Sequence, residues 1–396
     1  MDHSFVMTTS SHPDALAARR AIAAWLGVLF VLVMALITLG GFVRLSGSGL
    51  SIPDWPIIHI GESRSLLPPM TDAGWLAVRE RFDADQHILR EKVAAGVVGL
   101  GSLGRDPADM REFKRMFFIE WTHRFVAAIL GLVALGCLTT AWRHRHLRRD
   151  LGWKLSCIVG LIIFQAILGG FLVKSGTSTH WLFLHLGTAA IILASIVWTL
   201  LRAVSGVPPV PTAIQAERRR LRRLTTVTIT VVLVQIILGA LVAGSRSSGV
   251  MGQEAGSFST SWPLMYGHFI PPDLWNSQNS LTWNLLDNPT LHQWLHRWFA
   301  AIVLIYLGLV FWRARPLALG DRTRFALQAT ATLIGVQVVL GLANVFLEVP
   351  VVVALAHLVV ANLIVATLTM TLHDVRYELP EAGTHPISAP DQWAAV

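Results

Sequence analysis

The stretch WTHRFVAAI at residues 121–129 returns as WLHRWFAAI at residues 294–302. A second pair of matching stretches follows at nearly the same offset, QAILGG at residues 165–170 and QVVLGL at residues 337–342. A repeat has to be recognised before single motifs are interpreted, because each copy predicts the surroundings of the other. We therefore treat the chain as two related halves.

Histidines follow the same repeat. His123 precedes His185 by 62 residues, and His296 precedes His357 by 61. Each half thus has one histidine in the first repeated stretch and one near the start of a later apolar segment. Four matched points at one offset are hard to obtain by chance, so the four histidines are the first candidates for a shared function.

The composition is that of a membrane protein. The chain of 396 residues is 53% hydrophobic and 14% charged, with a mean hydropathy of +0.55, whereas soluble domains carry about 25% charged residues. The net charge of +8 comes from short basic clusters between apolar runs, which are typical of topology signals rather than of a nucleic-acid surface. The two cysteines lie in or beside apolar segments without a metal-binding or disulfide pattern.

Eight apolar segments are long enough to cross the hydrocarbon core, which takes about 20 residues. By hydropathy they cover roughly residues 21–43, 117–140, 153–174, 181–202, 224–245, 291–312, 325–347 and 351–373. Because each half has an even number of spans, both halves enter the membrane in the same direction. We predict an all-α integral membrane protein whose eight transmembrane helices form two tandem, parallel-repeated four-helix bundles.

Basic residues in the short connections set the orientation. They precede the first span, lie between spans two and three, precede span five and follow span six. The positive-inside rule then predicts that both termini are cytoplasmic and that the long loops 44–116 and 246–290 are periplasmic. The first 20 residues contain two aspartates and few arginines, which makes a poor organelle transit peptide. A bacterial inner membrane is therefore favoured over a mitochondrial one.

The expected organisation follows from the spans. It comprises a cytoplasmic tail (1–20), a first bundle (21–203), a basic cytoplasmic linker (204–223), a second bundle (224–374) and a cytoplasmic C-terminal tail (375–396).

Spans two, four, six and eight run inward from the outer surface, so all four histidines lie within about two turns of it, at 1.5 Å per residue. Neutral imidazole is a good axial ligand of haem iron, and the cores of helical bundles commonly hold cofactors. We predict that His123 and His185 in one bundle, and His296 and His357 in the other, each hold one haem iron. Interhelical hydrogen bonding is the simpler alternative, and a zinc site would need a recurring carboxylate or thiolate.

Glu120 breaks the symmetry of the repeat. It lies three residues before His123, on the same helical face, and its counterpart in the second half is Gln293. It can serve as a proton-transfer group at the haem site, or it can be an interfacial carboxylate paired with Arg124 or Lys114; both readings stay open. The asymmetry suggests that the first half performs chemistry and the second holds a permanent cofactor.

Three arginines are candidate partners of the haem propionates. Arg124 and Arg297 each follow a candidate ligand, and Arg44 ends the first span. Guanidinium groups bind carboxylates in a bidentate manner, although snorkelling to the interface is an equally simple role for such residues. The other histidines of the loops and span edges have no matched partner and are expected to be solvated.

Longer strings resemble a known family. GGFVRLSGSGLS at residues 40–51 and IEWTHR at residues 119–124, with ALVAGSR at residues 240–246 and TSWPLM at residues 260–265, are similar to haem A synthases. The resemblance runs from about Ala21 to Asp374. It implies a haem-modifying oxidoreductase that converts a ring methyl of haem O to the formyl of haem A and uses a b-type haem for electron transfer.

Carried over by the resemblance, His123 and His185 hold the substrate haem in the first bundle and Glu120 is the acid/base residue. His296 and His357 are then axial ligands of haem b in the second bundle. No cysteine pair is present in the first outer loop, so the chain resembles the cysteine-free class. The stretches 57–70 and 247–258 are longer than the family's usual pattern.

Two other functions remain as alternatives. A di-haem membrane cytochrome needs two equivalent haem sites and no Glu120, and a transporter needs helices broken at matching mid-span positions. The expected partners are haem O, a haem O synthase (farnesyltransferase) and cytochrome oxidase assembly factors, together with membrane lipids but no nucleic acid. Homo-oligomer formation stays open.

Overall fold

The computed structural model describes residues 13–95, 105–205, 216–245 and 262–377. Within these residues, eight helices are long and apolar enough to cross a membrane, which confirms the eight-span prediction. They are α1 (Pro13–Leu45), α3 (Met110–Arg143), α5 (Trp153–Lys174), α6 (Thr179–Ser205), α7 (Ala216–Gly244), α10 (Pro289–Ala314), α11 (Asp321–Phe346) and α12 (Val351–Tyr377).

Most of these helices are longer than the hydropathy pattern predicts, because their ends are polar and capped. Asp109 accepts a hydrogen bond from the Glu112 amide at 2.7 Å and starts α3 seven residues before the predicted span. Asn288 does the same for α10 through the Leu291 amide, at 3.1 Å. Hydropathy detects only the part of a helix that lies in lipid.

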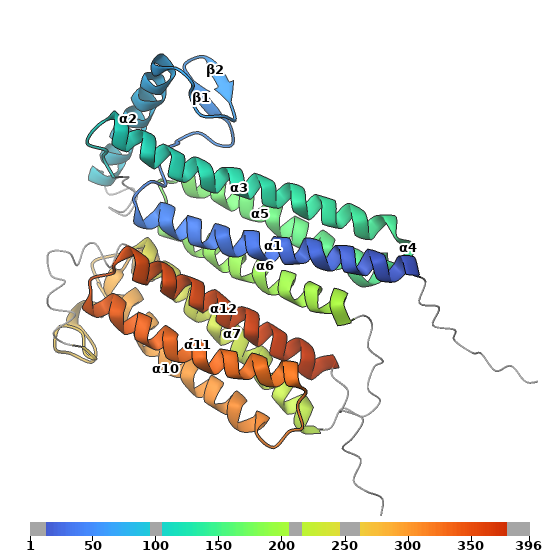
Figure 1. Ribbon diagram of the computed structural model, residues 1–396. Helices are drawn as coiled ribbons and strands as arrows, with labels where there is room; N and C mark the ends of the chain where they lie inside the picture. Colours follow the sequence, from blue (N-terminus) through green and yellow to red (C-terminus); the bar gives the residue numbers. More distant parts are fainter. Residues whose placement is uncertain (1–12, 96–104, 206–215, 246–261, 378–396) are drawn as a thin grey trace, which may run out of the picture.

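Figure 1 shows the long helices side by side in two groups. In the first group α1, α3, α5 and α6 pack as a ring, around a core that includes Leu26, Ala134 and Ile196. In the second, α7 packs on α10 and α12, and α12 on α11. Helices α1 and α6 of the first group contact α7 and α12 of the second. The outward faces carry large exposed apolar side chains such as Leu132 and Val339, as contact with lipid requires.

The first long loop contains structure that the hydropathy pattern missed. A small antiparallel hairpin pairs β1 (Ile58–Ile60) with β2 (Ser63–Ser65), so the described part of the fold is all-α apart from these two short strands. Helix α2 (Asp72–Ala94) then packs on α3 through a cluster of buried apolar side chains: Ile52, Ile58, Trp75, Val78, Phe82, Phe113 and Phe117. The helical spacing of the apolar residues in α2, after its N-cap Thr71, was the signal available in the sequence.

The other connections hold only short elements. They are α4 (Arg145–Leu147), the π-helical turn η2 (Arg148–Gly152), the 3-10 turn η4 (Pro272–Leu274) and α9 (Leu281–Leu286). The hairpin lies in the stretch 57–70 that exceeds the usual pattern. Four predicted parts lie wholly or partly outside the described residues: the stretch 247–258, half of the basic linker (206–215), residues 1–12 of the N-terminal tail and most of the C-terminal tail (378–396).

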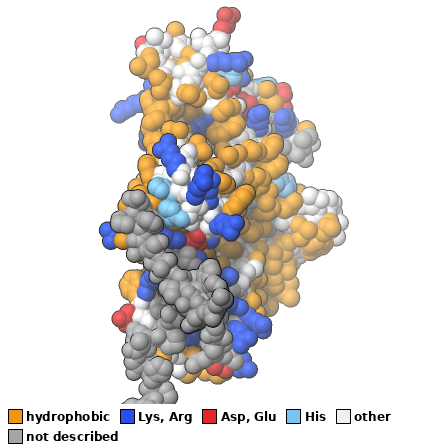
Figure 2. Space-filling model, turned by 90° about the vertical axis from the view of Figure 1, so that its right-hand side faces the viewer, with side chains coloured by type: hydrophobic (Ala, Val, Ile, Leu, Met, Phe, Trp, Pro, Cys, Tyr) orange, Lys and Arg blue, Asp and Glu red, His pale blue; other side chains and the backbone are white. Residues whose placement is uncertain are grey.

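The bundle has two distinct ends. We call the end with the hairpin, α2 and α9 the loop end, and the end where α1 begins and α12 finishes the terminal end (Figure 1). Figure 2 looks onto the terminal end, where Lys and Arg side chains lie among apolar ones.

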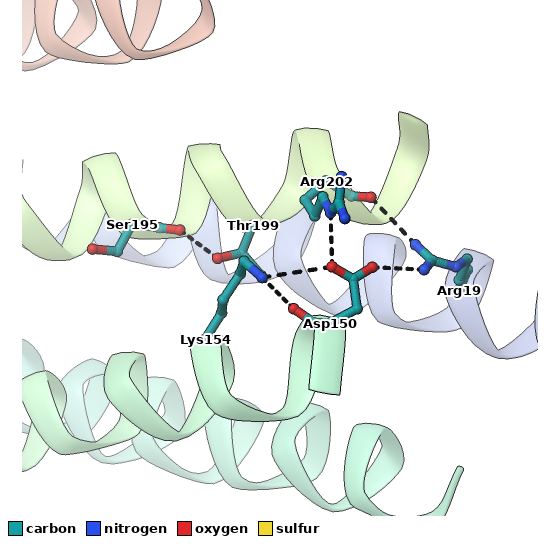
Figure 3. Close-up of polar contacts among 6 residues, drawn as sticks. All are labelled: Arg19, Asp150, Lys154, Ser195, Thr199 and Arg202. Atoms are coloured by element: carbon teal, nitrogen blue, oxygen red, sulfur yellow. Dashed lines mark hydrogen bonds and ion pairs between the residues drawn. The ribbon is translucent and has the colours of Figure 1, made fainter. Parts of the chain in front are cut away.

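An ion cluster at the terminal end joins three parts of the first group (Figure 3). Asp150 in the η2 turn is bonded by Arg19 of α1 and by Arg202 of α6, each at 2.7 Å, and lies 3.5 Å from the Lys154 ammonium. Its side chain is only 12% exposed, so the two arginines compensate a largely buried charge. Arg19 and Arg202 therefore hold α1 and α6 to the η2 turn.

Candidate functional site

The four repeated histidines lie on four helices toward the loop end. His123 is on α3, His185 on α6, His296 on α10 and His357 on α12. These helices all begin at the loop end, and three of the histidines fall within about two turns of the helix start, with His123 less than four turns in. Each of the two helix groups thus has one pair of imidazoles at the same end of the molecule.

The pair in the second group has the spacing of two ligands on one metal ion. The ring centres of His296 and His357 are 6.4 Å apart, and the ring planes make an angle of 72°. Two imidazoles that each bind one metal through a nitrogen at about 2 Å have ring centres roughly 6 Å apart. An iron between these two rings would need no large movement of α10 or α12.

In the first group, His123 and His185 lie on α3 and α6, two helices of the ring around one core. The Nδ1 atoms of His185 and His357 are buried and have no hydrogen-bond partner among the described residues. A buried polar atom is costly unless it is paired, so these nitrogens fit a site that holds a ligand.

The donor set fits haem better than a free metal ion. No group of three or more His, Cys, Asp or Glu side chains that could hold a metal occurs in the described part of the chain. A structural zinc site takes four protein ligands and a catalytic one usually three, whereas haem iron needs only one or two axial ligands from the protein. Two imidazoles per helix group match the number of axial ligands that a haem iron takes from the protein.

Glu120 is buried, at 3% exposure, and fully engaged. Its carboxylate accepts hydrogen bonds from the Ser51 hydroxyl at 2.8 Å and from the Ile52 amide at 3.0 Å, and it forms an ion pair with Arg124. The structure therefore contains the Arg124 ion pair that the sequence left open. Lys114, the other partner considered, instead approaches Asp72 at 3.7 Å. The ion pair does not exclude a proton-transfer role, since Glu120 lies one helical turn from His123.

The three candidate propionate partners all have protein partners. Arg124 donates to the carbonyls of Ile52 and Asp54 at 2.6 and 2.5 Å, and Arg297 to those of Pro263 and Leu264. These guanidinium groups therefore bind the backbone of two loop segments, around residues 52–54 and 263–264, which we call the covering segments.

Arg44 bridges the two helix groups. It donates to the Thr177 hydroxyl at 3.0 Å and to the Ala243 and Gly244 carbonyls at the end of α7, at 2.9 and 3.2 Å. These bonds join the end of the first span to the end of α7, and a contact between Arg44 and a propionate stays a prediction.

Two tryptophans have the same role as the arginines and were not singled out from the sequence. The Trp121 indole donates to the Leu66 carbonyl at 3.0 Å, and the Trp294 indole to the Phe269 carbonyl at 2.8 Å. Their place in the repeated stretch was the available signal. In both copies the Trp and the Arg hold the covering loop, while the His lies toward a neighbouring helix.

One expectation about the remaining histidines was wrong. His292 is fully buried, and its Nε2 lies 3.0 Å from the Leu285 carbonyl. It lies one turn before His296 and ties α9 to α10, so a histidine without a repeat partner can still be structural.

Comparison with known proteins identifies the family of the chain. Residues 23–369 match the family model described as "Cytochrome oxidase assembly protein". The haem A synthase of Paracoccus denitrificans is 34% identical over 370 residues, which cover 91% of this chain and 89% of that protein. The haem A synthase of Erythrobacter litoralis is 32% identical over 90% of this chain and 97% of that protein. The haem A synthase of Rhizorhabdus wittichii is also 32% identical, over 93% of this chain and 98% of that protein. The chain therefore belongs to the haem A synthase family of cytochrome oxidase assembly proteins.

Proposed function

We propose that the chain oxidises a ring methyl of haem O to the formyl of haem A, with haem O bound in the first helix group and a resident haem b in the second. Family membership supports the activity, since the relatives match over nearly their whole length. The 6.4 Å spacing of the His296 and His357 rings is the observation that carries the site assignment. No such support exists for a di-haem electron carrier or a transporter.

In this proposal His123 and His185 hold the substrate, and His296 and His357 hold haem b. When bound, the two haem groups would supply the redox-active iron through which electrons pass, and the protein supplies binding, orientation and proton handling. The covering segments at the loop end, held by Trp121 and Arg124, exclude water from the first site.

Glu120 is the residue that we assign to proton transfer. Ile52 and Arg124 fix the position of its carboxylate, while the Ser51 hydroxyl can both donate and accept and so links the carboxylate to the covering loop. Gln293 stands at the equivalent position of the second half and cannot take up a proton at neutral pH. This difference supports chemistry in the first group and electron transfer in the second.

The two helix groups are proposed to be the tandem four-helix units 21–203 and 224–374. Basic residues gathered at the terminal end support cytoplasmic termini, which places the loop end in the periplasm of a bacterial inner membrane. Cys137 and Cys157 lie in the spanning helices α3 and α5, and no cysteine lies in the first outer loop, as in the cysteine-free class. A haem O synthase is the natural partner, because a reactive membrane-buried porphyrin is best passed on directly.

The test is product formation by a matched pair of variants. The protein is expressed with a haem O synthase, and extracted haems are identified by chromatography and mass. His185→Ala should abolish haem A formation while haem b stays bound. His180→Ala, which removes a half-exposed imidazole on the same helix that lies 4.0 Å from Asp287, should form haem A as wild type does. Normal haem A formation by His185→Ala would remove that residue from the substrate site.

A further inference from the structure

Each of the four imidazoles lies against a glycine of the neighbouring helix. A Cβ atom added to Gly40 would lie 3.2 Å from the His123 ring, and one added to Gly169 would lie 3.4 Å from the His185 ring. For Gly239 and His296 the distance is 3.0 Å, and for Gly341 and His357 it is 3.2 Å. Three of these distances are shorter than ordinary contacts and the fourth, at Gly169, is at their lower edge, so a side chain larger than glycine would press on the His123, His296 and His357 rings.

Three of these glycines follow a glutamine by one helical turn, in the segments QAILG (165–169), QIILG (235–239) and QVVLG (337–341). We call each Gln with its Gly a glutamine–glycine clamp. Because residues four apart share a helix face, both members can contact the same histidine. The third copy, at 235–239, was not apparent in the repeat, because it lies on the first helix of the second half.

The glutamines contact the same histidines as the glycines. The Gln165 amide donates to the His185 carbonyl at 3.0 Å. The Gln235 amide donates to the His296 carbonyl at 2.8 Å and lies 3.2 Å from Nδ1 of that ring. Gln337 lies 3.2 Å from the ring of His357 through Nε2 of both residues.

The carboxamide oxygens of all three glutamines are buried and unpaired among the described residues. The Gln235 amide is fixed by its bond to the His296 carbonyl, whereas turning the Gln337 amide by 180° exchanges nitrogen and oxygen, a choice that coordinates alone do not fix. The oxygen would then accept a proton from one ring nitrogen and leave the other nitrogen unprotonated, as a metal ligand must be.

His123 is the exception. The residue one turn before Gly40 is Leu36, which packs in the apolar core of the first group. No hydrogen bond to the His123 ring is found in the part of the chain that the structure describes. Gln165 bonds the backbone carbonyl of His185 and not its ring. The second group thus has two clamps that reach the imidazole ring, and the first group has one clamp, which holds its histidine only through the backbone.

We propose that the glutamine–glycine clamps are positioning elements that fix the haem ligands, and that their unequal number makes haem resident in the second group and exchangeable in the first. This rests on the proposed function and assigns the difference between its two sites. Groups that hydrogen-bond a metal-ligating histidine orient it and strengthen it as a donor. A substrate haem must leave as product, so a site with one unclamped ligand suits turnover, while an electron-transfer haem is best held by two clamped ligands.

The first experiment compares variants within α11. Gly341→Ala and Gln337→Leu should alter the low-spin electron paramagnetic resonance signal of the second-group haem and speed its loss to apomyoglobin by about 10-fold or more. The controls are Gly335→Ala, where an added Cβ meets nothing within 4 Å, and Gln328→Leu, an exposed glutamine. If Gly341→Ala does not fold, the result for Gln337→Leu still tests the clamp. Gln337→Glu keeps the shape of the side chain and a hydrogen-bond acceptor for the His357 ring, so this variant should retain the haem.

The second experiment adds the missing glutamine. In wild-type protein loaded with haem O and haem b, haem should leave in a fast phase from the first group and a slow phase from the second. Leu36→Gln should slow the fast phase by about 10-fold, whereas Leu32→Gln, one turn away in the same core, should not.

The outcomes separate the two proposals. Equal rates for both haems in wild type, or α11 variants that behave as their controls, would overturn the clamp while leaving the haem sites intact. A wild-type protein that binds no haem through His296 and His357 would overturn the proposed function itself.

Discussion

Replacing Glu120 by Gln changes one oxygen for an NH₂ group in a buried, fully paired site. The carboxylate accepts from Ser51, from the Ile52 amide and from Arg124. A carboxamide has one oxygen, so it can serve either the Ile52 amide or the Arg124 guanidinium, and its NH₂ group then faces the other donor. Losing one hydrogen bond to a charged group costs about 1.5–3 kcal/mol.

That cost is smaller than the total stability of a typical folded protein, about 5–15 kcal/mol, so Glu120→Gln should fold. We expect a lower melting temperature in detergent, an unchanged haem b spectrum and no haem A. The assay combines thermal unfolding, a pyridine haemochrome spectrum and mass analysis of extracted haems. Wild-type haem A formation by the folded variant would refute the proton-transfer role. Unchanged stability would refute the pairing scheme around Glu120.

Three further predictions follow from other parts of the molecule. His296→Ala should lose the b-type haem while His268→Ala, an exposed histidine of the same half, keeps it; a retained low-spin haem spectrum in His296→Ala would contradict the ligand assignment. Asp150→Leu should destabilise the first helix group by about 3–5 kcal/mol, because it leaves Arg19 and Arg202 as largely buried charges without their partner. The control is Asp83→Leu, which removes an ion pair nearer the surface. Equal melting temperatures of the two variants would contradict the role of the Asp150 cluster. Asp287→Asn should raise the melting temperature at pH 7, because burial raises the pKa of Asp287 and its charged form disfavours folding. The gain in melting temperature should vanish below the pKa of the unfolded chain, about 4. A variant that is less stable than wild type at pH 7 would contradict this account, because it would show that the bonds of the carboxylate outweigh the cost of its burial.

The spans could be predicted because lipid leaves a strong signal, and the repeat singled out four histidines that the structure places toward one end of the molecule. A segment in lipid must satisfy all its backbone hydrogen bonds internally, so apolar length alone reveals the helices. Their ends could not be placed from apolarity, since α3 starts at the polar cap Asp109 outside the apolar run. The class of relatives also followed from long strings such as residues 40–51.

The partners of the charged residues were beyond the sequence pattern. Nothing in the chain order shows that Arg124 and Arg297 bind loop carbonyls 33 to 72 residues away, or that Arg44 reaches the end of α7. These contacts depend on how the covering loops fold back, which is a tertiary property. The glutamine at 235 was missed for a similar reason: its link to His296 is visible only when α7 lies beside α10.

The central claim is that one haem lies between two imidazoles in each helix group, toward the loop end. A cryo-electron microscopy map of the full chain purified with haem O and haem b would test it directly. The account predicts a porphyrin whose iron is bonded by both His296 and His357, and a second, more weakly occupied porphyrin beside His123 and His185. Porphyrin density at another place, or imidazoles of a pair pointing away from each other into lipid, would contradict it.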